Sequence, residues 1–273
     1  MTTLYLSQLW LNARSRDAWR DLADCQGLHR TLMRAFPDGI GSDEDGARAS
    51  AGLLFRPEAD RRTGTVRILA QSSSLPNWRV LPAGYVAPTS ECPDGWSTRT
   101  VPESVWNTEA GARRRFRLRA NVTAKVFGNR VPLRTEAAQL AWLLSHATAA
   151  GFRVTLPPLG EVLPDGHPEA KRAHDLRGVG PVDGLPPVRI DRDTPVSGLR
   201  PGEAASASAG ASAGASAGAS AGARPPRARL SFEGLVFEGI LEISDPERFA
   251  TAVRQGVGPA KAYGYGLLSV APA

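Results

Sequence analysis

Cysteine is scarce in this chain of 273 residues, which contains only Cys25 and Cys92. Two isolated cysteines build neither a disulfide framework nor a thiolate metal site. The four histidines also lack the spacing of metal ligands, so we expect no catalytic metal and no cofactor. No apolar run reaches 18 residues, and the N-terminus lacks a secretory pattern. We therefore expect a cytoplasmic protein without a membrane segment.

Lysine is also rare, because the 33 basic residues include only Lys125, Lys171 and Lys261. The net charge is nevertheless +6 and the isoelectric point about 9.9, which suits a polyanionic partner. The planar guanidinium of arginine favours paired contacts to phosphate and stacking on bases. A skewed codon composition produces the same bias, and the sequence gives both explanations equal weight.

The common phosphate-binding motifs are absent from the glycine-rich segment 256–266. It has no Gly-Lys-Ser/Thr, and Lys261 stands where a dinucleotide fingerprint has its third glycine. The segment also runs from a helix into a strand, the reverse of both motifs. Its backbone amides beside Lys261 are suited to holding a phosphate, with Gly256 and Gly258 in the cradle. A tight turn that requires glycine for steric reasons explains the pattern equally well.

His29 is the candidate for acid–base chemistry. On a helix that advances about 100° per residue, it shares an arc with Leu32 and Phe36, opposite Arg30 and Arg34. A histidine on an apolar face is often a core residue with satisfied hydrogen bonds. If the face instead lines a cleft, the imidazole serves as general base or acid in phosphodiester cleavage.

The first predicted unit spans residues 1–130. Its expected elements are a strand at 4–12, a helix to residue 36 that breaks near 24–27, and strands at 52–55, 65–71 and 115–122. The last strand alternates basic and apolar residues, so Arg115, Arg117 and Arg119 are expected together on one open face. This order matches much of a ferredoxin-like unit, without a clear second helix.

The second predicted unit spans residues 134–273. Thr135 is expected to cap a helix that closes at Gly151, and the sequence 244–247 is a capping box before another helix. Strands are expected at 228–237, 239–243 and 264–270. The whole chain is therefore predicted to be α+β, with two ferredoxin-like domains in tandem.

A Ser-Ala-Gly-Ala repeat occupies residues 204–223 and interrupts the second unit. A short tract of this composition inside a charged globular chain is typical of a flexible linker. A structural protein that assembles through this tract is the more distant alternative. In that case, deletion of the tract would abolish assembly.

Several blocks of the sequence resemble the CasE-type CRISPR RNA-processing endoribonucleases of type I-E systems. They lie near both ends and in the centre of the chain, in the order that the family has. The blocks are 4–12, 15–16, 21–23, 28–32, 116–121, 237–239, 245–246, 256–262 and 266–268. Residues 152–227 contribute almost nothing to the resemblance.

The resemblance implies tandem ferredoxin-like domains of the RAMP type and metal-independent cleavage of CRISPR repeat RNA beside a stem-loop. The family reaction is attack by the 2′-hydroxyl, which leaves a 2′,3′-cyclic phosphate. Members typically keep the product hairpin within the surveillance complex, so the expected partners are the repeat stem-loop and the other subunits. The family histidine corresponds to His29, and we expect Arg30, Arg34 and Lys261 to contact phosphate.

One position departs from the family pattern. Some members have a tyrosine three residues before the histidine, where this chain has Gln26. Glutamine donates hydrogen bonds but supplies no phenolic proton. Either His29 works with a different helper, or cleavage is slow. The alternative interpretation of the chain is a catalytically inert subunit that binds the RNA hairpin within the same complex.

Overall fold

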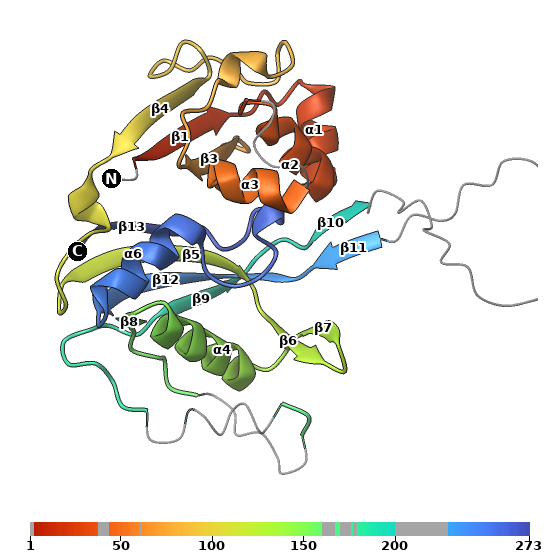
Figure 1. The fold of residues 1–273 in the computed structure, drawn as a ribbon. Coiled ribbons are helices and arrows are strands. Elements are labelled where there is room, and N and C mark those ends of the chain that lie inside the picture. Colours follow the sequence, from red (N-terminus) through yellow and green to blue (C-terminus); the bar gives the residue numbers. More distant parts are fainter. Residues whose placement is uncertain are drawn as a thin grey trace, which may run out of the picture.

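A computed structural model of the protein describes residues 3–37, 44–60, 62–159, 167–169, 176, 179–199 and 229–273. These residues form two antiparallel β-sheets with helices packed on them, the first sheet above the second in Figure 1. The expected linker 204–223 lies outside the described residues. Within the described ranges, no helix has the length and apolarity needed to cross a lipid bilayer.

The first sheet has the strand order β2-β3-β1-β4, and all its pairs are antiparallel. Its elements are β1 (Leu4–Trp10), α1 (Arg16–Ala23), α2 (Cys25–Met33), α3 (Glu44–Ala51), β2 (Leu54–Ala59), β3 (Val66–Ser72), η1 (Trp78–Val80) and β4 (Trp96–Val101). This is the ferredoxin-like order. The short 3₁₀ turn η1 lies between β3 and β4, where the second helix of that fold belongs.

The second sheet repeats the same order as β13-β5-β12-β8, and β9 also pairs with β12. Its elements are η2 (Glu103–Val105), β5 (Arg113–Asn121), α4 (Glu136–Ala149), β8 (Phe152–Arg153), β9 (Arg189–Arg192), β12 (Gly234–Ile243), α6 (Pro246–Gln255), η4 (Lys261–Tyr263) and β13 (Leu268–Pro272). The chain is therefore α+β with tandem ferredoxin-like domains, as the sequence predicts.

Two small ribbons extend from this sheet. One is the hairpin of β6 (Thr123–Val126) and β7 (Asn129–Pro132). The other pairs β10 (Val196–Leu199) with β11 (Arg229–Phe232), and it lies above the hairpin in Figure 1. Both ribbons are on the same side of the molecule as α1 and α2.

The expected boundary between residues 130 and 134 is wrong, because β5 belongs to the second sheet, where it pairs with β12 and β13. The fourth strand of the first sheet is β4, in a stretch expected to be mostly loop. It is an edge strand that pairs only with β1 and is made largely of serine, threonine and arginine. A strand of this composition has no regular alternation of apolar and polar residues, so its sequence does not predict a strand.

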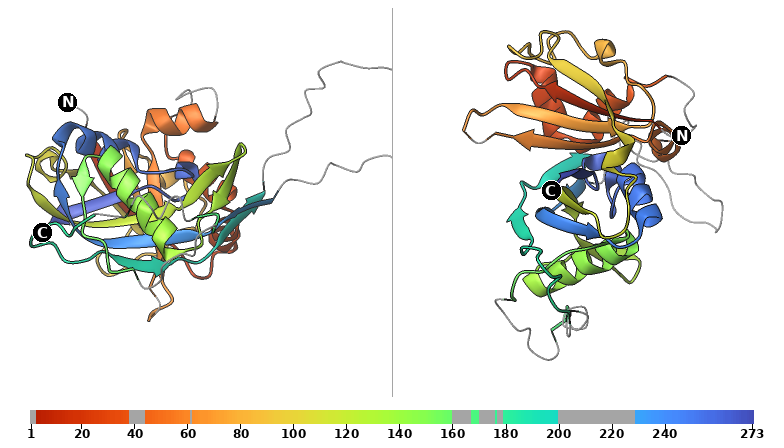
Figure 2. Two further views of the ribbon diagram at one scale, coloured as in Figure 1. Left: turned by 90° about the horizontal axis from the view of Figure 1, so that it is seen from below. Right: turned by 90° about the vertical axis from the view of Figure 1, so that its left-hand side faces the viewer.

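Apolar side chains of α4 and α6 form the core of the second unit against β5 and β12. Phe152, Phe237 and Phe249 have no exposed surface, and rings of the three residues lie about 6 Å from aromatic neighbours. In the right-hand view of Figure 2, α4 lies at the end of the molecule farthest from the first unit. The face of the second sheet that α4 does not cover therefore meets the first unit.

A buried polar cluster joins the two sheets. The Arg56 guanidinium of β2, only 4 % exposed, donates two hydrogen bonds to Glu58, at 2.7 and 2.9 Å. It also donates to the carbonyl oxygens of Arg117 and Leu267 in the second unit, at 3.3 and 3.5 Å. Glu58 accepts further bonds from Arg67 and Arg117. One carboxylate therefore neutralises the cation that connects the sheets.

Burial alone would raise the pKa of the Glu58 carboxyl, but the neighbouring Arg56 charge and the hydrogen bonds from Arg56 and Arg67 hold it below its ordinary value. A carboxyl whose pKa is lower in the folded than in the unfolded state stabilises the fold above its unfolded pKa. That contribution is lost as the pH falls through the folded pKa. The cluster therefore makes the fold sensitive to acid.

We expect Glu58→Gln to lower the free energy of unfolding by roughly 3 kcal/mol at neutral pH, because it leaves the buried Arg56 charge without a carboxylate. Urea unfolding at about pH 7 and about pH 4 measures this, and the deficit of the variant should shrink in acid. Glu91→Gln removes an exposed loop carboxyl and should change stability by less than about 0.5 kcal/mol. A Glu58→Gln protein as stable as wild type at neutral pH would contradict the assignment.

Candidate functional site

His29 lies on α2, which begins immediately after α1 ends. Asp24 separates the two helices and caps α2, because its carboxylate accepts a hydrogen bond from the Gln26 amide at 3.2 Å. The His29 side chain is 2 % exposed. Its ring is stacked against Phe55 of β2, with centroids 6.5 Å apart and an angle of 16° between the planes. Gln26 is equally buried.

A buried carboxylate fixes α2 against α1. Asp21 accepts a hydrogen bond from the Thr31 hydroxyl at 2.6 Å and one from the Tyr85 hydroxyl at 3.1 Å. Burial, followed by the charge of Asp21, raises the pKa of Tyr85 above its ordinary value. The tyrosine therefore stays protonated as a donor, and the helix that carries His29 is held in one orientation.

The ribbon strand β10 packs against the start of α2. A Cβ atom on Gly198 would lie 2.7 Å from Cys25 Sγ and 2.8 Å from an Asp24 carboxylate oxygen, so only glycine allows this approach. Burial, followed by the charge of Asp24, raises the pKa of the Cys25 thiol to about 11. A raised pKa keeps the thiol protonated at neutral pH, which is the opposite of what activates a cysteine nucleophile.

The glycine-rich segment returns from α6 to the first unit. The Val257 amide donates to the Gly266 carbonyl at 2.9 Å, and the Gly266 amide donates to the Arg119 carbonyl at 2.8 Å. These bonds close the segment into a loop, and its 3₁₀ turn η4 packs against both α2 and β2. A Cβ on Gly264 would lie 3.1 Å from Phe55, the residue that stacks on His29. The structure thus brings the end of the loop beside His29.

Lys261 lies in η4 and is half-buried. Burial, and then the nearby positive charge of Arg48 on α3, lower the pKa of its ammonium group. Arg48 also donates to the Leu53 carbonyl oxygen at 3.2 Å. Lys261 on η4 and Arg48 on α3 therefore bring two positive charges close together.

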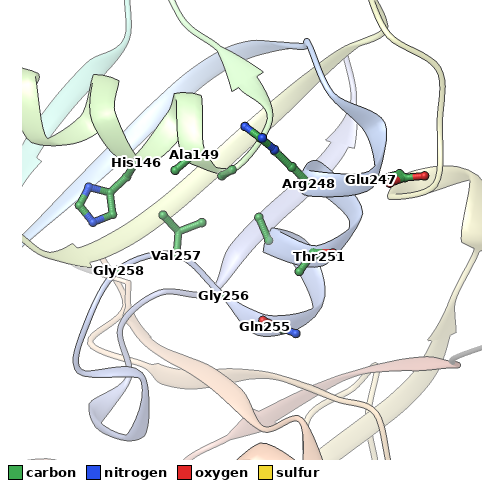
Figure 3. Close-up of a pocket in the computed structure, with 11 residues that line it drawn as sticks. His146, Ala149, Glu247, Arg248, Thr251, Gln255, Gly256, Val257 and Gly258 are labelled. Carbon is green, nitrogen blue, oxygen red and sulfur yellow. The ribbon is translucent and has the colours of Figure 1, made fainter.

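Gly256 and Gly258 also border a second place, although a Cβ on Gly256 would lie 2.8 Å from both the Leu54 side chain of β2 and the Gly266 carbonyl oxygen. They line a pocket of about 410 Å³ between α4 and α6, together with His146 and Arg248, as Figure 3 shows. A Cβ on Gly258 would lie 2.8 Å from the Trp142 ring. His146 Nδ1 is hydrogen-bonded to the Trp142 carbonyl at 2.8 Å, and burial lowers the pKa of His146. The first half of the glycine-rich loop therefore borders the pocket between α4 and α6, whereas its turn η4 borders α2 and β2.

The expected open face of three arginines on β5 is wrong for Arg119, whereas Arg115 and Arg117 are exposed. Arg115 is exposed and donates to the Pro272 carbonyl at 3.0 Å, whereas Arg117 forms ion pairs with Glu58 and Glu238. Arg119 is only 4 % exposed. Its burial follows from the loop that covers the central strand at this point.

Arg119 instead holds the loop in place. It forms an ion pair with Asp193, donates to the Gly264 carbonyl at 3.2 Å and lies 4.5 Å from the centre of the Tyr265 ring. Of the remaining predicted cations, Arg30 on α2 is 58 % exposed and lies 3.9 Å from Asp24. Arg34, directly after α2, is also exposed.

Comparison with known proteins agrees with this architecture. A family model described as CRISPR associated protein matches residues 4–272. The chain belongs to this family. It is 33 % identical to the CRISPR-associated endoribonuclease Cse3 of Thermus thermophilus, over 98 % of this chain and all of the relative. It is 26 % identical, over the same shares, to the CRISPR system Cascade subunit CasE of Escherichia coli K12.

A solved structure of Thermus thermophilus Cse3, bound to an RNA representing a pre-cleavage complex, has the same fold. It aligns with a TM-score of 0.66 at 31 % identity, over 99 % of this chain and all of that one. In this CRISPR-associated protein, sequence reasoning missed Phe55, Arg48, Asp193 and Tyr265. The missed residues contact the site from other elements, and the only sequence signal is the Tyr-Gly-Tyr-Gly at 263–266.

Gly266→Ala should destabilise the protein more than Gly111→Ala. The glycines have φ of 84° and 83°, so each alanine carries left-handed strain of about 1–2 kcal/mol. Only at position 266 would the new Cβ also meet a carbonyl oxygen, that of Val257, at 2.8 Å, whereas nothing lies within 4 Å at position 111. Urea unfolding of both variants measures the difference, and equal stabilities would contradict the close approach.

Proposed function

We propose that this protein is an endoribonuclease that cleaves CRISPR repeat RNA beside a stem-loop. The observation that carries the proposal is the packing of the glycine-rich loop, with Lys261, against the helix of the buried His29. A relative that aligns along nearly the whole chain is named an endoribonuclease, and its structure is solved with RNA. Both features of the site come from residues that the family alignment covers.

The proposed reaction needs two proton transfers and no metal ion. The 2′-hydroxyl before the scissile phosphate loses its proton and attacks phosphorus, and the 5′-oxygen leaves with a proton. The products are a 2′,3′-cyclic phosphate and a 5′-hydroxyl. We assign one of the transfers to His29, as general base or general acid, because histidine titrates near neutral pH in its unperturbed state.

The cations around α2 receive supporting roles in this proposal. Lys261 binds the scissile phosphate beside His29, while Arg30 and Arg34 contact the backbone nearby from the exposed side of α2. Arg115 and Arg117 remain candidates for contact with the stem. Arg119 is reassigned to holding the loop, and Gly256 and Gly258 to shaping its first half.

We further propose that the protein keeps the product hairpin and acts within a type I-E surveillance complex in the cytoplasm. The support is the relative named as a Cascade subunit. An excess of arginine on a basic chain suits prolonged contact with RNA.

A catalytically inert subunit that binds the same hairpin is the second candidate. The burial of His29 favours it, because a side chain that is 2 % exposed reaches a phosphate only after its neighbours move. The two candidates differ in one measurable result, the appearance of cleaved RNA.

We expect His29→Asn to slow cleavage of a stem-loop repeat RNA by at least about 100-fold, while binding of the RNA is retained. Asparagine keeps a polar side chain in the buried position but cannot exchange protons near neutral pH. The measurement is single-turnover cleavage in EDTA, with the product end examined for a 2′,3′-cyclic phosphate.

His146→Asn is the matched control, since this histidine lies in the pocket of Figure 3 and should leave the rate unchanged. Tight binding without cleavage by the wild type would favour the inert subunit. Cleavage by both histidine variants at the wild-type rate would remove His29 from the mechanism.

Lys261→Met should weaken RNA binding and flatten its salt dependence. Loss of one phosphate contact lowers the slope of log Kd against log salt by about 0.7–0.9. Filter binding at several salt concentrations measures the slope. Arg79→Met removes an exposed cation on η1 and should leave the slope unchanged, and the same slope for both variants would rule out the Lys261 contact.

A further inference from the structure

A second cleft opens at the base of the β6–β7 hairpin, where β11 and η4 approach it. Its volume is about 680 Å³. Figure 1 shows the hairpin beside the β10–β11 ribbon on the side of the molecule that carries α2. Its lining includes Asn121, Thr123, Arg130, Phe232, Glu233 and Tyr263.

Asn121 is a buried polar residue that lines this cleft. It is 4 % exposed. The Thr123 hydroxyl, also in the lining, is buried without a hydrogen-bond partner there. Buried polar groups are normally hydrogen-bonded, so the Thr123 hydroxyl points to a ligand that supplies its missing partner.

The cleft also has an aromatic wall. The rings of Phe232 on β11 and Tyr263 on η4 are stacked, with centroids 4.9 Å apart and planes inclined by 29°. The buried Tyr265 ring also contacts Phe232, with centroids 5.9 Å apart and planes inclined by 53°. Aromatic rings that line a polar cleft offer a face on which a planar ring of a ligand can stack.

Two charged residues line the cleft, Arg130 and Glu233, and the Glu233 carboxylate is paired with Arg134 at 3.4 Å. Arg130 on β7 is exposed and lines the cleft. The Asn121 amide presents a donor and an acceptor, which match the edge of a base. The aromatic wall matches the face of the base, and the Arg130 guanidinium matches the phosphate of the nucleotide.

We propose that this cleft binds one unpaired nucleotide of the RNA and reads its base. The base stacks on the Phe232–Tyr263 wall, the Asn121 amide hydrogen-bonds its edge, and Arg130 contacts its phosphate. An unstacked base enters such a cleft, whereas a base within a duplex does not. The inference rests on the proposed function. Because Tyr263 belongs to η4, which packs on α2, the nucleotide lies close to the proposed cleavage site.

The test crosses single abasic substitutions in the RNA with Asn121→Ala. A stem-loop repeat RNA is prepared with one abasic nucleotide at each unpaired position flanking the stem, and its binding to the full-length protein is measured. At one position, loss of the base should weaken binding by about tenfold in wild type and by less than about twofold in Asn121→Ala. If, at every position, loss of the base weakens binding by the same factor in wild type and in Asn121→Ala, the proposal is overturned.

Two further variants separate recognition from folding. Phe232→Tyr keeps an aromatic wall and should retain the abasic effect at that position, whereas Phe232→Leu should lose it. Asn107→Ala, an exposed asparagine bonded to Glu103, is the matched control and should bind like wild type. Equal weakening of every RNA by Asn121→Ala would show a structural role and overturn the proposal.

The outcomes distinguish this inference from the proposed function. A wild-type protein that neither binds nor cleaves repeat RNA would refute the proposed function. A protein that cleaves the RNA normally, with no position coupled to Asn121, would refute the subsite alone. Binding of a free mononucleotide that survives in Asn121→Ala would likewise count against it.

Discussion

The candidate site depends on the interactions of the buried Arg119 guanidinium. Its side chain binds Asp193, the Gly264 carbonyl and the Tyr265 ring, and its own carbonyl accepts the Gly266 amide. The loop therefore has both its second half and its turn fixed to one residue of the central strand β5. A cation taken out of water without a carboxylate would be strongly destabilising, so Asp193 is part of the same arrangement.

The position of this loop determines what surrounds α2. Its turn η4 packs against the helix, and Gly264 approaches Phe55, which stacks on His29. From the other direction, β10 approaches so closely that Gly198 has no space for a side chain. The helix of the first unit is therefore enclosed by two elements of the second. The candidate site belongs to the interface and not to either sheet alone.

The sequence was informative about local structure and about the fold class. The predicted cap Thr135 accepts a backbone hydrogen bond at the start of α4, and the cap of α6 lies within the predicted box, at Asp245. Both could be predicted because capping depends on residues only two or three positions apart. The assignment of β5 to a sheet failed for the opposite reason. An alternating pattern defines two faces, but it contains no information about which distant strands pair with it.

The same limit applies to the site. Sequence reasoning identified His29 and the glycine-rich segment, and the structure places the end of that segment beside the histidine's helix. It gave no sign that Arg119 is buried, since in the sequence this arginine looks like Arg115 and Arg117. Nor did it separate the two halves of the loop, because a glycine's neighbours in space are set by φ and by tertiary packing.

The hydrogen bonds between the two sheets have a consequence for how the molecule unfolds. Arg56 donates to carbonyl groups of the second unit, and the buried Gln71 amide donates to the Val253 carbonyl at 2.7 Å. If one unit melted first, it would leave these donors exposed on a surface built to be covered. Heat denaturation should therefore be a single cooperative transition, with equal calorimetric and van't Hoff enthalpies, although the chain contains two ferredoxin-like domains.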